Sequence, residues 1–460
     1  MSHLGTVPIA AFFMFAAASA GVAQTGPEAS DRPNATIDVQ LGGGSSDALD
    51  RLENILRRVV SIRGLEPLTE LQASMHTREQ LRQSLLDMIA EQMTPEDFAK
   101  EEAVLRRMGI LPQDSDYFGL TVNLLTSQIA GFYDDSEKQL FVLEDIPILT
   151  VEPVLAHELV HALQDQHFGI ERTRGEWERN NDALLAASAV FEGDATALMV
   201  EYVLGGSLSI ADIPNFQSLA EQNLSIPQPG QGGVPAEAPG FLLETMIFPY
   251  LSGLTFVHYL KVASGWPGVD EVYHAMPRST EQILHPERYL DNDDPTWVEF
   301  DIDTPEWMLI YDQVLGEFQW AAWLRELNQD VVSQRAVEAA CEGWDGDRLR
   351  AYRDESERVI VTDLSVWDSS ADARDLFMVA TPLFKANFGE PVEELEWSGT
   401  HGSLSAVRYA DQWILVEQWG DMMLTIIGLS PNWDANRVLD WRLAIWRSRT
   451  RQTYGSQTQN

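Results

Sequence analysis

The feature that most constrains this chain is a pair of histidines four residues apart, with a glutamate directly after the first. His157, Glu158 and His161 make an HExxH pattern. On an α-helix, positions i and i+4 lie on one face, so both imidazoles can converge on one metal ion while Glu158 reaches a water bound to it. Zinc suits neutral imidazole ligands and lowers the pKa of its bound water toward about 7. The pattern therefore predicts a zinc-binding helix in which Glu158 is the general base.

The residues around the motif favour a helix. Thr150 is a suitable N-cap, and Pro153 falls in the first turn, where proline is tolerated. An apolar face at helical spacing is supplied by Leu155, Leu159, Ala162 and Leu163. A structural pair of histidines in an ordinary core helix is the alternative interpretation of the same pattern.

The segment from His157 to Asp165, HELVHALQD, resembles the zinc helix of thermolysin-like gluzincins. This local resemblance implies a zinc peptidase whose third metal ligand is a glutamate on a following helix. The chain also resembles, more widely, a group of largely uncharacterised exported bacterial proteins presumed to be metallopeptidases. Besides the zinc helix, that wider resemblance is carried by residues 131–134 (GFYD), 192–196 (EGDAT) and 279–287 (STEQILHPE).

Glu192 is the predicted third ligand. It lies in a helix predicted from Asp182 to Leu204 and ended by a pair of glycines. Its neighbours in sequence are apolar, so its carboxylate is expected to face inward, where an unpaired charge is costly and a zinc ion would offset that cost. The usual gluzincin interval falls closer to Glu178 and Asp182, which lie in a charged stretch suited to solvent. These two acids are the competing candidates.

A histidine ligand normally donates its other ring N–H to a carboxylate or a carbonyl group. Asp165, one turn beyond His161, and Asp194, near Glu192, are the candidates for this role. Asp194 departs from the thermolysin pattern, in which the second acid lies four residues after the ligand. That position is held here by Thr196.

Peptide hydrolysis also needs a hydrogen-bond donor for the developing oxyanion, and the motif itself offers none. His285 is the first candidate, because it ends a short helix that Ser279 caps and Pro286 stops, and irregular segments often carry catalytic groups. The alternative for His285 is a surface histidine at a helix C-terminus. The competing donors are Tyr250, Tyr133 and His167.

Charge and cysteine content restrict the partners and the metal ligands. The chain has 31 Lys and Arg against 71 Asp and Glu, a formal net charge of −40, which repels nucleic acid and anionic lipid. Cys341 is the single cysteine, so an internal disulfide and a cysteine-based zinc cluster are excluded. The expected partner is a peptide or protein substrate, and no nucleic acid is expected.

Five segments are expected along the chain. Residues 1–23 are predicted to be a signal peptide, because the apolar run from Val7 to Ala20 is too short to span a bilayer and ends in small residues. The protein is therefore expected to be exported to the periplasm or the medium, without stable membrane insertion after cleavage. The later segments are a flexible leader (24–46), a helical N-terminal subdomain (47–125), an HExxH catalytic region (126–342) and an α+β unit (343–460).

A short hairpin is predicted just before the zinc helix, with strands 131–133 and 139–143. The gluzincin resemblance implies that a strand beside the site binds extended peptide through its edge, so residues 139–143 are expected to accept a substrate strand. An ordinary buried hairpin is the alternative. Farther along, the patterns predict a long loop over 207–240, a helix from Phe248 and helices over 307–340.

These patterns together predict a mostly helical α+β protein with a gluzincin-like centre that binds one Zn²⁺ per chain. The predicted reaction is hydrolysis of peptide bonds by a zinc-bound water. The residues assigned to it are Glu158, His285 and Tyr250 as catalytic groups and His157, His161 and Glu192 as metal ligands. The second hypothesis is a zinc-stabilised, non-catalytic binding or scaffold protein of the cell envelope. The presence of Glu158 favours the enzyme, because a structural site has no use for a base.

Overall fold

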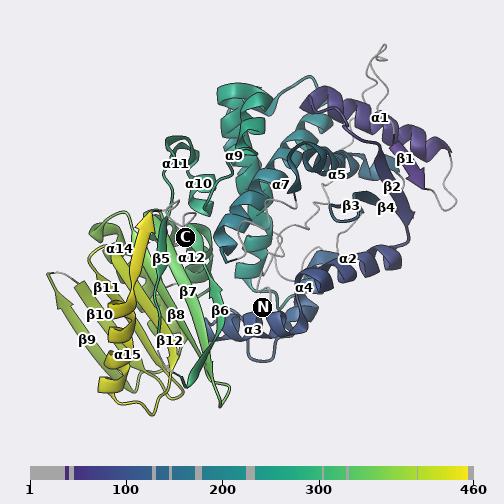
Figure 1. Ribbon diagram of the computed structural model, residues 1–460. Coiled ribbons are helices and arrows are strands. Elements are labelled where there is room, and N and C mark those ends of the chain that lie inside the picture. The colour runs from purple at the N-terminus through teal and green to yellow at the C-terminus, as the bar shows by residue number, and fades with distance from the viewer. Residues whose placement is uncertain are drawn as a thin grey trace.

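A computed structural model describes residues 37–40, 46–126, 131–144, 148–170, 179–223, 234–302, 305–327, 331–400 and 402–453 (Figure 1). These residues form a mixed α+β protein, as the sequence predicted. A small sheet, a group of helices and a large sheet follow one another across the molecule (Figure 1). The predicted signal peptide, residues 1–23, and most of the predicted leader lie outside the described residues.

The small sheet has four strands in the order β1, β2, β4, β3. Their bounds are β1 Ile37–Gln40, β2 Leu71–His76, β3 Gly131–Asp134 and β4 Gln139–Leu143. β1, β2 and β4 run parallel, and β3 completes the predicted hairpin antiparallel to β4. β1 lies in the segment predicted as a flexible leader, and β2 interrupts a region predicted to be helical. The sequence of β2, LQASMH, alternates apolar and polar residues, and it buries Leu71 and Ala73.

The strand order corrects the prediction that residues 139–143 accept a substrate strand. These residues form β4, which lies between β2 and β3. Both edges of β4 are therefore paired within the sheet, and no peptide can add to it. The edge strand on this side of the sheet is β3.

Four long helices build the region of the HExxH motif, which is carried by one of them, α5. Their bounds are α1 Ser46–Arg63, α5 Ile148–Phe168, α7 Asn181–Val203 and α9 Gly240–Val272. α5 begins at Ile148, so Thr150 lies inside the helix and is not its N-cap. α7 agrees with the predicted helix, whereas α9 begins before the predicted Phe248 and carries Pro249 inside it.

α7 and α9 approach each other closely because both have glycine at their contact. A Cβ atom on Gly253 would lie 2.0 Å from the carbonyl oxygen of Ala189, and one on Gly193 would lie 2.3 Å from the backbone of Gly253. No larger side chain fits at either position without moving a helix. Because Gly193 directly follows Glu192, this contact fixes the turn of α7 that carries the predicted third ligand.

Two described helices, α7 and α9, are long and apolar enough to cross a membrane by length and composition. Their most apolar windows are 83% and 67% buried inside the protein. Packing within the core therefore accounts for most of their apolar surface.

The shorter helices complete the central part of the molecule. Their bounds are α2 Arg78–Gln92, α3 Pro95–Arg107, α4 Tyr117–Thr126, α8 Phe216–Asn223, α10 Thr280–Leu284, α11 Pro286–Asp291, α12 Gly316–Glu326 and α13 Gln334–Cys341. Ser279 caps α10 by accepting the backbone N–H of Gln282, as predicted. α8 lies in the segment predicted as a long loop, residues 207–240.

The large sheet has seven antiparallel strands in the order β6, β7, β8, β12, β11, β10, β9. Their bounds are β6 Trp307–Gln313, β7 Trp344–Asp354, β8 Val359–Trp367, β9 Glu393–Gly399, β10 Gly402–Arg408, β11 Trp413–Trp419 and β12 Met422–Leu429. The prediction of helix for residues 307–313 is wrong, because this segment pairs with β7 as an edge strand. The predicted α+β unit therefore takes its first strand from before residue 343.

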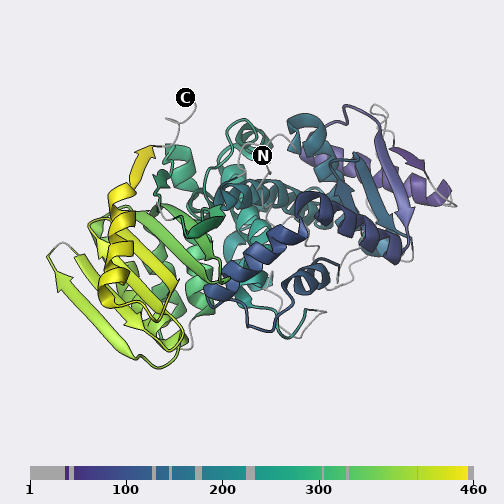
Figure 2. The same ribbon diagram turned by 60° about the horizontal axis from the view of Figure 1, so that its bottom comes forward.

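Helices cover both faces of the large sheet. α14 (Ser370–Asn387) packs on one face, and α15 (Ala435–Ser448) lies across the other (Figure 2). A short pair, β5 (Thr296–Glu299) and β13 (Thr450–Thr453), lies beside it. One hydrophobic core continues from the central helices to the α14 face of this sheet and includes Trp320 and Trp344.

Candidate metal centre

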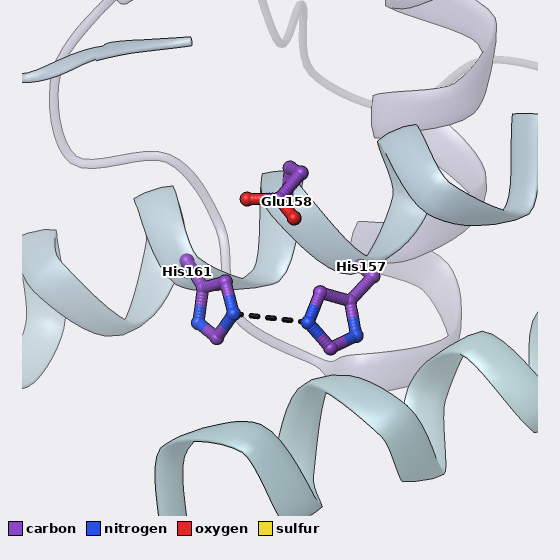
Figure 3. Close-up of side chains that lie close together, drawn as sticks. All are labelled: His157, Glu158 and His161. Carbon is purple, nitrogen blue, oxygen red and sulfur yellow. Dashed lines mark hydrogen bonds between the residues drawn. The ribbon is translucent and has the colours of Figure 1, made fainter. Parts of the chain in front are cut away.

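Helix α5 carries the HExxH residues on neighbouring turns (Figure 3). The rings of His157 and His161 lie on the same side of the helix, with their Nε2 atoms 3.1 Å apart. His157 is buried, and its Nδ1 has no hydrogen-bond partner among the described residues. The four-residue spacing brings the two imidazoles together because they lie one turn apart on one face.

Glu192 of α7 completes a group of three facing atoms. Its Oε2 lies 3.0 Å from Nε2 of His157 and 3.4 Å from Nε2 of His161. Burial alone would raise the pKa of Glu192, but the two histidines outweigh it and lower the pKa to about 2. Burial likewise opposes protonation of His161, but Glu192 raises its pKa to about 9. These three residues could hold a metal ion.

Glu158 is the second carboxylate near the imidazoles. One of its oxygens lies within 4.8 Å of ring nitrogens of both histidines. Its Oε2 accepts a hydrogen bond of 2.9 Å from the backbone N–H of Tyr133 in β3. Burial raises the pKa of Glu158, and the two histidines oppose that rise. Because Glu192 lies closer to both Nε2 atoms, Glu192 is the better placed ligand and Glu158 is left for another role.

His161 has a hydrogen-bond partner that the sequence analysis missed. Its Nδ1 lies 2.8 Å from Oε1 of Gln164, which is fully buried on α5. The amide nitrogen of Gln164 donates to Oδ2 of Asp194 and to the backbone oxygen of Phe191, so the amide oxygen must face His161. In the neutral ring this places the proton on Nδ1 and the lone pair on Nε2, toward Glu192. The available signal was the i, i+3 spacing of His161 and Gln164 on one helix.

Asp194 does not make the predicted direct contact with His161, because the side chain of Gln164 lies between them. It is fully buried and accepts two hydrogen bonds from Arg63 of α1, at 2.7 and 3.1 Å, and one from the hydroxyl of Tyr273, at 2.7 Å. Burial alone would raise the pKa of Asp194, but Arg63 holds it below its usual range. A buried chain of contacts therefore runs from His161 through Gln164 and Asp194 to Arg63.

Asp165, the other predicted partner of His161, contacts the hairpin instead. Its carboxylate accepts a hydrogen bond of 2.8 Å from the hydroxyl of Tyr133 and one of 2.9 Å from the ammonium of Lys138. The prediction for Asp165 is therefore wrong. Its side chain joins the end of α5 to β3 and to the turn that follows it.

Two of the predicted oxyanion donors lie in different places. Tyr250 is buried in α9, and its ring stacks on that of His157 with a centroid distance of 6.1 Å. His285, at the end of α10, has its Nε2 3.0 Å from Oε1 of Glu317 in α12. It makes no hydrogen bond with the HExxH residues or Glu192. The structure therefore does not support the catalytic role predicted for His285, because packing directs its ring toward α12.

The remaining candidates are engaged elsewhere. The hydroxyl of Tyr133 contacts Asp165, and His167 lies 2.7 Å from the backbone oxygen of Glu66. Asp182 is buried and accepts hydrogen bonds from the backbone N–H and the hydroxyl of Thr280, about three helical turns before Glu192. Asp182 is therefore not a ligand of this group. Glu178, the other competitor, lies outside the described residues.

The match to a known family covers most of the large sheet and does not include the candidate metal centre. Residues 309–434 match a family model described as a domain of unknown function, DUF8575. This match begins inside β6 and ends before α15, so it contains none of the HExxH residues. No curated protein and no solved structure matches the chain. These comparisons therefore assign no chemistry to the HExxH residues.

Proposed function

We propose that this protein is a zinc-dependent peptidase of the gluzincin type, with His157, His161 and Glu192 as the metal ligands. The observation that carries the proposal is the spacing of the three ligand atoms, which lie 3.0, 3.1 and 3.4 Å from one another. Tetrahedral zinc with bonds of about 2.0–2.1 Å needs ligand atoms about 3.3–3.4 Å apart. Two imidazoles and one carboxylate are also a ligand set of catalytic zinc sites, which keep the fourth position for water.

The surroundings of His161 support the same proposal. Histidines that bind metals normally donate their second ring N–H to a fixed acceptor, which holds the tautomer and the orientation of the ring. The amide oxygen of Gln164 is such an acceptor. The buried pair of Asp194 and Arg63 holds the amide in this orientation, so the preference for Nε2 as the ligand atom is built into the fold.

Glu158 is the proposed general base. Zinc, when bound at this site, supplies a Lewis acid that acidifies a water and polarises the scissile carbonyl. Glu158 lies beside both imidazoles, and the backbone N–H of Tyr133 holds its Oε2. From this position it takes a proton from the attacking water and delivers it to the leaving amine.

An extended peptide is the proposed substrate, bound at β3. This strand is at the edge of the small sheet, and the N–H of Tyr133 is directed away from β4 toward Glu158. A peptide that adds to this edge through main-chain hydrogen bonds would pass beside Glu158. β3 therefore replaces residues 139–143 as the proposed substrate strand.

Tyr250 is the proposed donor for the oxyanion. Its ring lies against that of His157, and a tyrosine hydroxyl can donate a hydrogen bond to developing negative charge. Export is a further part of the proposal and is supported by the apolar run from Val7 to Ala20. The substrate would then be a peptide or protein outside the cytoplasm.

Cleavage of a mixed peptide library by the full-length protein tests this function. The wild type should cleave peptides, a chelator should stop cleavage, and added zinc should restore it. Glu158→Gln should keep its metal and cleave about 10²–10⁴-fold more slowly, because it lacks the base. Wild-type rates in this variant would exclude Glu158 as the base. Bound zinc without any cleavage by the wild type would favour the non-catalytic, zinc-stabilised protein instead.

A further inference from the structure

A second histidine–glutamate group lines a cavity of about 740 Å³. The cavity lies between α9, the end of α10, α12 and α13, and His285 and Glu317 are part of its wall. Its volume is in the range of about 300–1,000 Å³ that is usual for small-molecule sites. Much of the rest of the wall is apolar and includes Ile247, Phe248, Leu251 and Phe318.

Helix α9 separates this cavity from the metal centre. Phe248 and Leu251 line the cavity, whereas Tyr250 lies against His157 and Gly253 packs on α7. Positions three residues apart share a helix face, so the cavity and the metal centre use different faces of α9. The three proposed metal ligands and Glu158 are absent from the cavity wall.

Glu317 is a buried carboxylate of the cavity wall, and one of its oxygens lacks a hydrogen-bond donor among the described residues. It is 5% exposed, and its Oε1 lies 3.0 Å from Nε2 of His285. Its Oε2 has no hydrogen-bond partner among the described residues. A buried carboxylate oxygen without a donor is costly, and burial raises the pKa of Glu317 although His285 opposes that rise. Because Oε2 has no exposed surface, a cation in the cavity would offset this cost through its charge beside the carboxylate and not by touching Oε2.

The cavity also carries an excess of negative charge. Glu244 and Arg325 form an ion pair with each other, so they add no net charge. The other charged or titratable side chains of the wall are Glu317, Glu338, Glu342, Arg335 and His285. Glu338 on α13 and Glu342, directly after that helix, are exposed and lower the electrostatic potential for a ligand that approaches from solvent. Anions are therefore repelled from this cavity and cations are attracted.

An organic cation fits the wall better than a metal ion does. Among the described residues, the His and Glu ligand atoms that gather within 4.8 Å of one another in threes lie at the HExxH motif and Glu192, and none of them lies in the cavity. The apolar surface of Phe248, Leu251 and Phe318 offers no metal ligands. It does offer a surface for the hydrocarbon part of a molecule whose charged end pairs with Glu317.

We infer that this cavity binds a small organic cation, an ammonium or guanidinium group carried on an apolar stem, with Glu317 as the counter-charge. The inference goes beyond the proposed peptidase function and does not rest on it, since no proposed metal ligand takes part. It also gives a role to residues 279–287, which the metal centre does not use. In that segment α10 and the break before Pro286 bring His285 to Glu317.

Binding of three matched probes to the full-length protein tests this inference by isothermal titration calorimetry. The probes are 4-phenylbutylamine, the neutral 4-phenylbutanol and the anionic 4-phenylbutyrate. The amine should bind about tenfold or more tightly than the alcohol, the gain expected of one charge-assisted hydrogen bond, and the acid should bind most weakly. Equal affinities for the amine and the alcohol, or no binding of the amine, would overturn the inference.

Two variants and a chelator locate the bound amine. Ala339→Trp fills the cavity from an exposed position of α13 and should weaken amine binding at least about tenfold, with an unchanged thermal midpoint. The double variant Glu338→Gln/Glu342→Gln should weaken it about three- to tenfold. Its matched control, Glu355→Gln/Glu390→Gln, removes two exposed acids outside the cavity and should bind within about twofold of wild type.

The chelator separates this site from the metal centre. Amine binding should be the same with and without chelator, because the cavity wall contains none of the proposed metal ligands. Loss of binding on chelation would place the amine on the metal and overturn the inference. Wild-type affinity in Ala339→Trp would overturn it equally. Failure of peptide cleavage would leave the result unaffected, since no measurement here depends on turnover.

Discussion

The same residue types lie on the two sides of α9 in two different arrangements, on neighbouring helices. On one side, His157 and His161 lie against a single oxygen of Glu192, with all three atoms within 3.4 Å of one another. On the other side, His285 meets Glu317 alone beside an open cavity. Convergence of three ligand atoms suits a metal ion, whereas a buried carboxylate with a partner on one oxygen only, beside apolar surface, suits an organic cation. The arrangement of the atoms, more than the residue types, therefore decides the ligand.

The two groups also differ in what lies behind them. The metal centre is supported by a buried chain from Gln164 through Asp194 to Arg63, which continues to Asp270 at 2.6 Å. Behind Glu317 no described donor reaches Oε2. The first group is therefore held in one geometry by its surroundings, whereas one oxygen of the second group is buried without a partner among the described residues.

The largest effect is expected from breaking the buried support of the metal centre. Asp194→Ala leaves Arg63 buried without its main partner and should lower the free energy of unfolding by about 3–5 kcal/mol. The control Glu53→Ala removes a partly exposed partner of the exposed Arg57 and should lower it by about 1 kcal/mol or less. Urea denaturation of the three proteins measures both. Equal losses would show that the buried chain contributes no special support.

A smaller effect is expected on metal affinity. Gln164→Met keeps the approximate volume but removes the acceptor for Nδ1 of His161, so zinc affinity should fall about 10–100-fold. Gln166→Met, on the same helix, changes a residue that bonds to the backbone near Thr69 and should leave the affinity unchanged. Competition with a chromophoric chelator measures both variants. Equal affinities for wild type and Gln164→Met would remove Gln164 from the centre.

The smallest effect concerns the pair beside the cavity. The hydrogen bond between His285 and Glu317 raises the pKa of His285. The pair therefore adds to the free energy of unfolding, and this contribution is fully present below the ordinary histidine pKa of about 6.5. That stability is lost as pH rises through the raised pKa of the folded protein. Between about pH 6.5 and that value, the free energy of unfolding of wild type should fall by on the order of 1 kcal/mol more than that of His285→Gln.

The control for this pH dependence is Glu317→Gln, which removes the charge that raises the pKa of His285. Denaturation at several pH values should give the same flattened dependence in both variants. A slope like that of wild type in either variant would mean that the pair does not titrate in this range. His285 and Glu317 would then not form a pair that changes its charge in this pH range.

The local parts of the proposed metal centre could be predicted from the sequence, and its distant parts could not. The paired histidines follow from helical spacing, and Glu192 follows from an acid placed among apolar residues. The contact of His161 with Gln164 could also have been predicted, because Gln164 lies three positions after His161 on the same helix. The contact of Arg63 with Asp194 could not, because it joins residues 131 positions apart, and no local pattern encodes that pairing.

The errors in the predicted fold have the same cause. Residues 307–313, WMLIYDQ, have no clear period, so the sequence alone could not separate a helix from the strand that pairs with β7. Residues 139–143 were expected to form an edge strand. That expectation was wrong because β4 pairs with β2, a segment far away in the sequence, and no local pattern shows such a pairing. His285 was correctly placed at a helix end, but its neighbours depend on how α10 packs against α12.

Metal content tests the central claim most directly. Purified full-length wild type, Glu192→Ala and Glu317→Gln are dialysed against metal-free buffer after incubation with zinc and measured by elemental analysis. Wild type and Glu317→Gln should each retain one zinc per chain. Glu192→Ala should retain less than about a tenth, because loss of a ligand should exceed the 10–100-fold effect of losing a partner of a ligand. A full equivalent in Glu192→Ala, or none in wild type, would contradict the proposed metal centre.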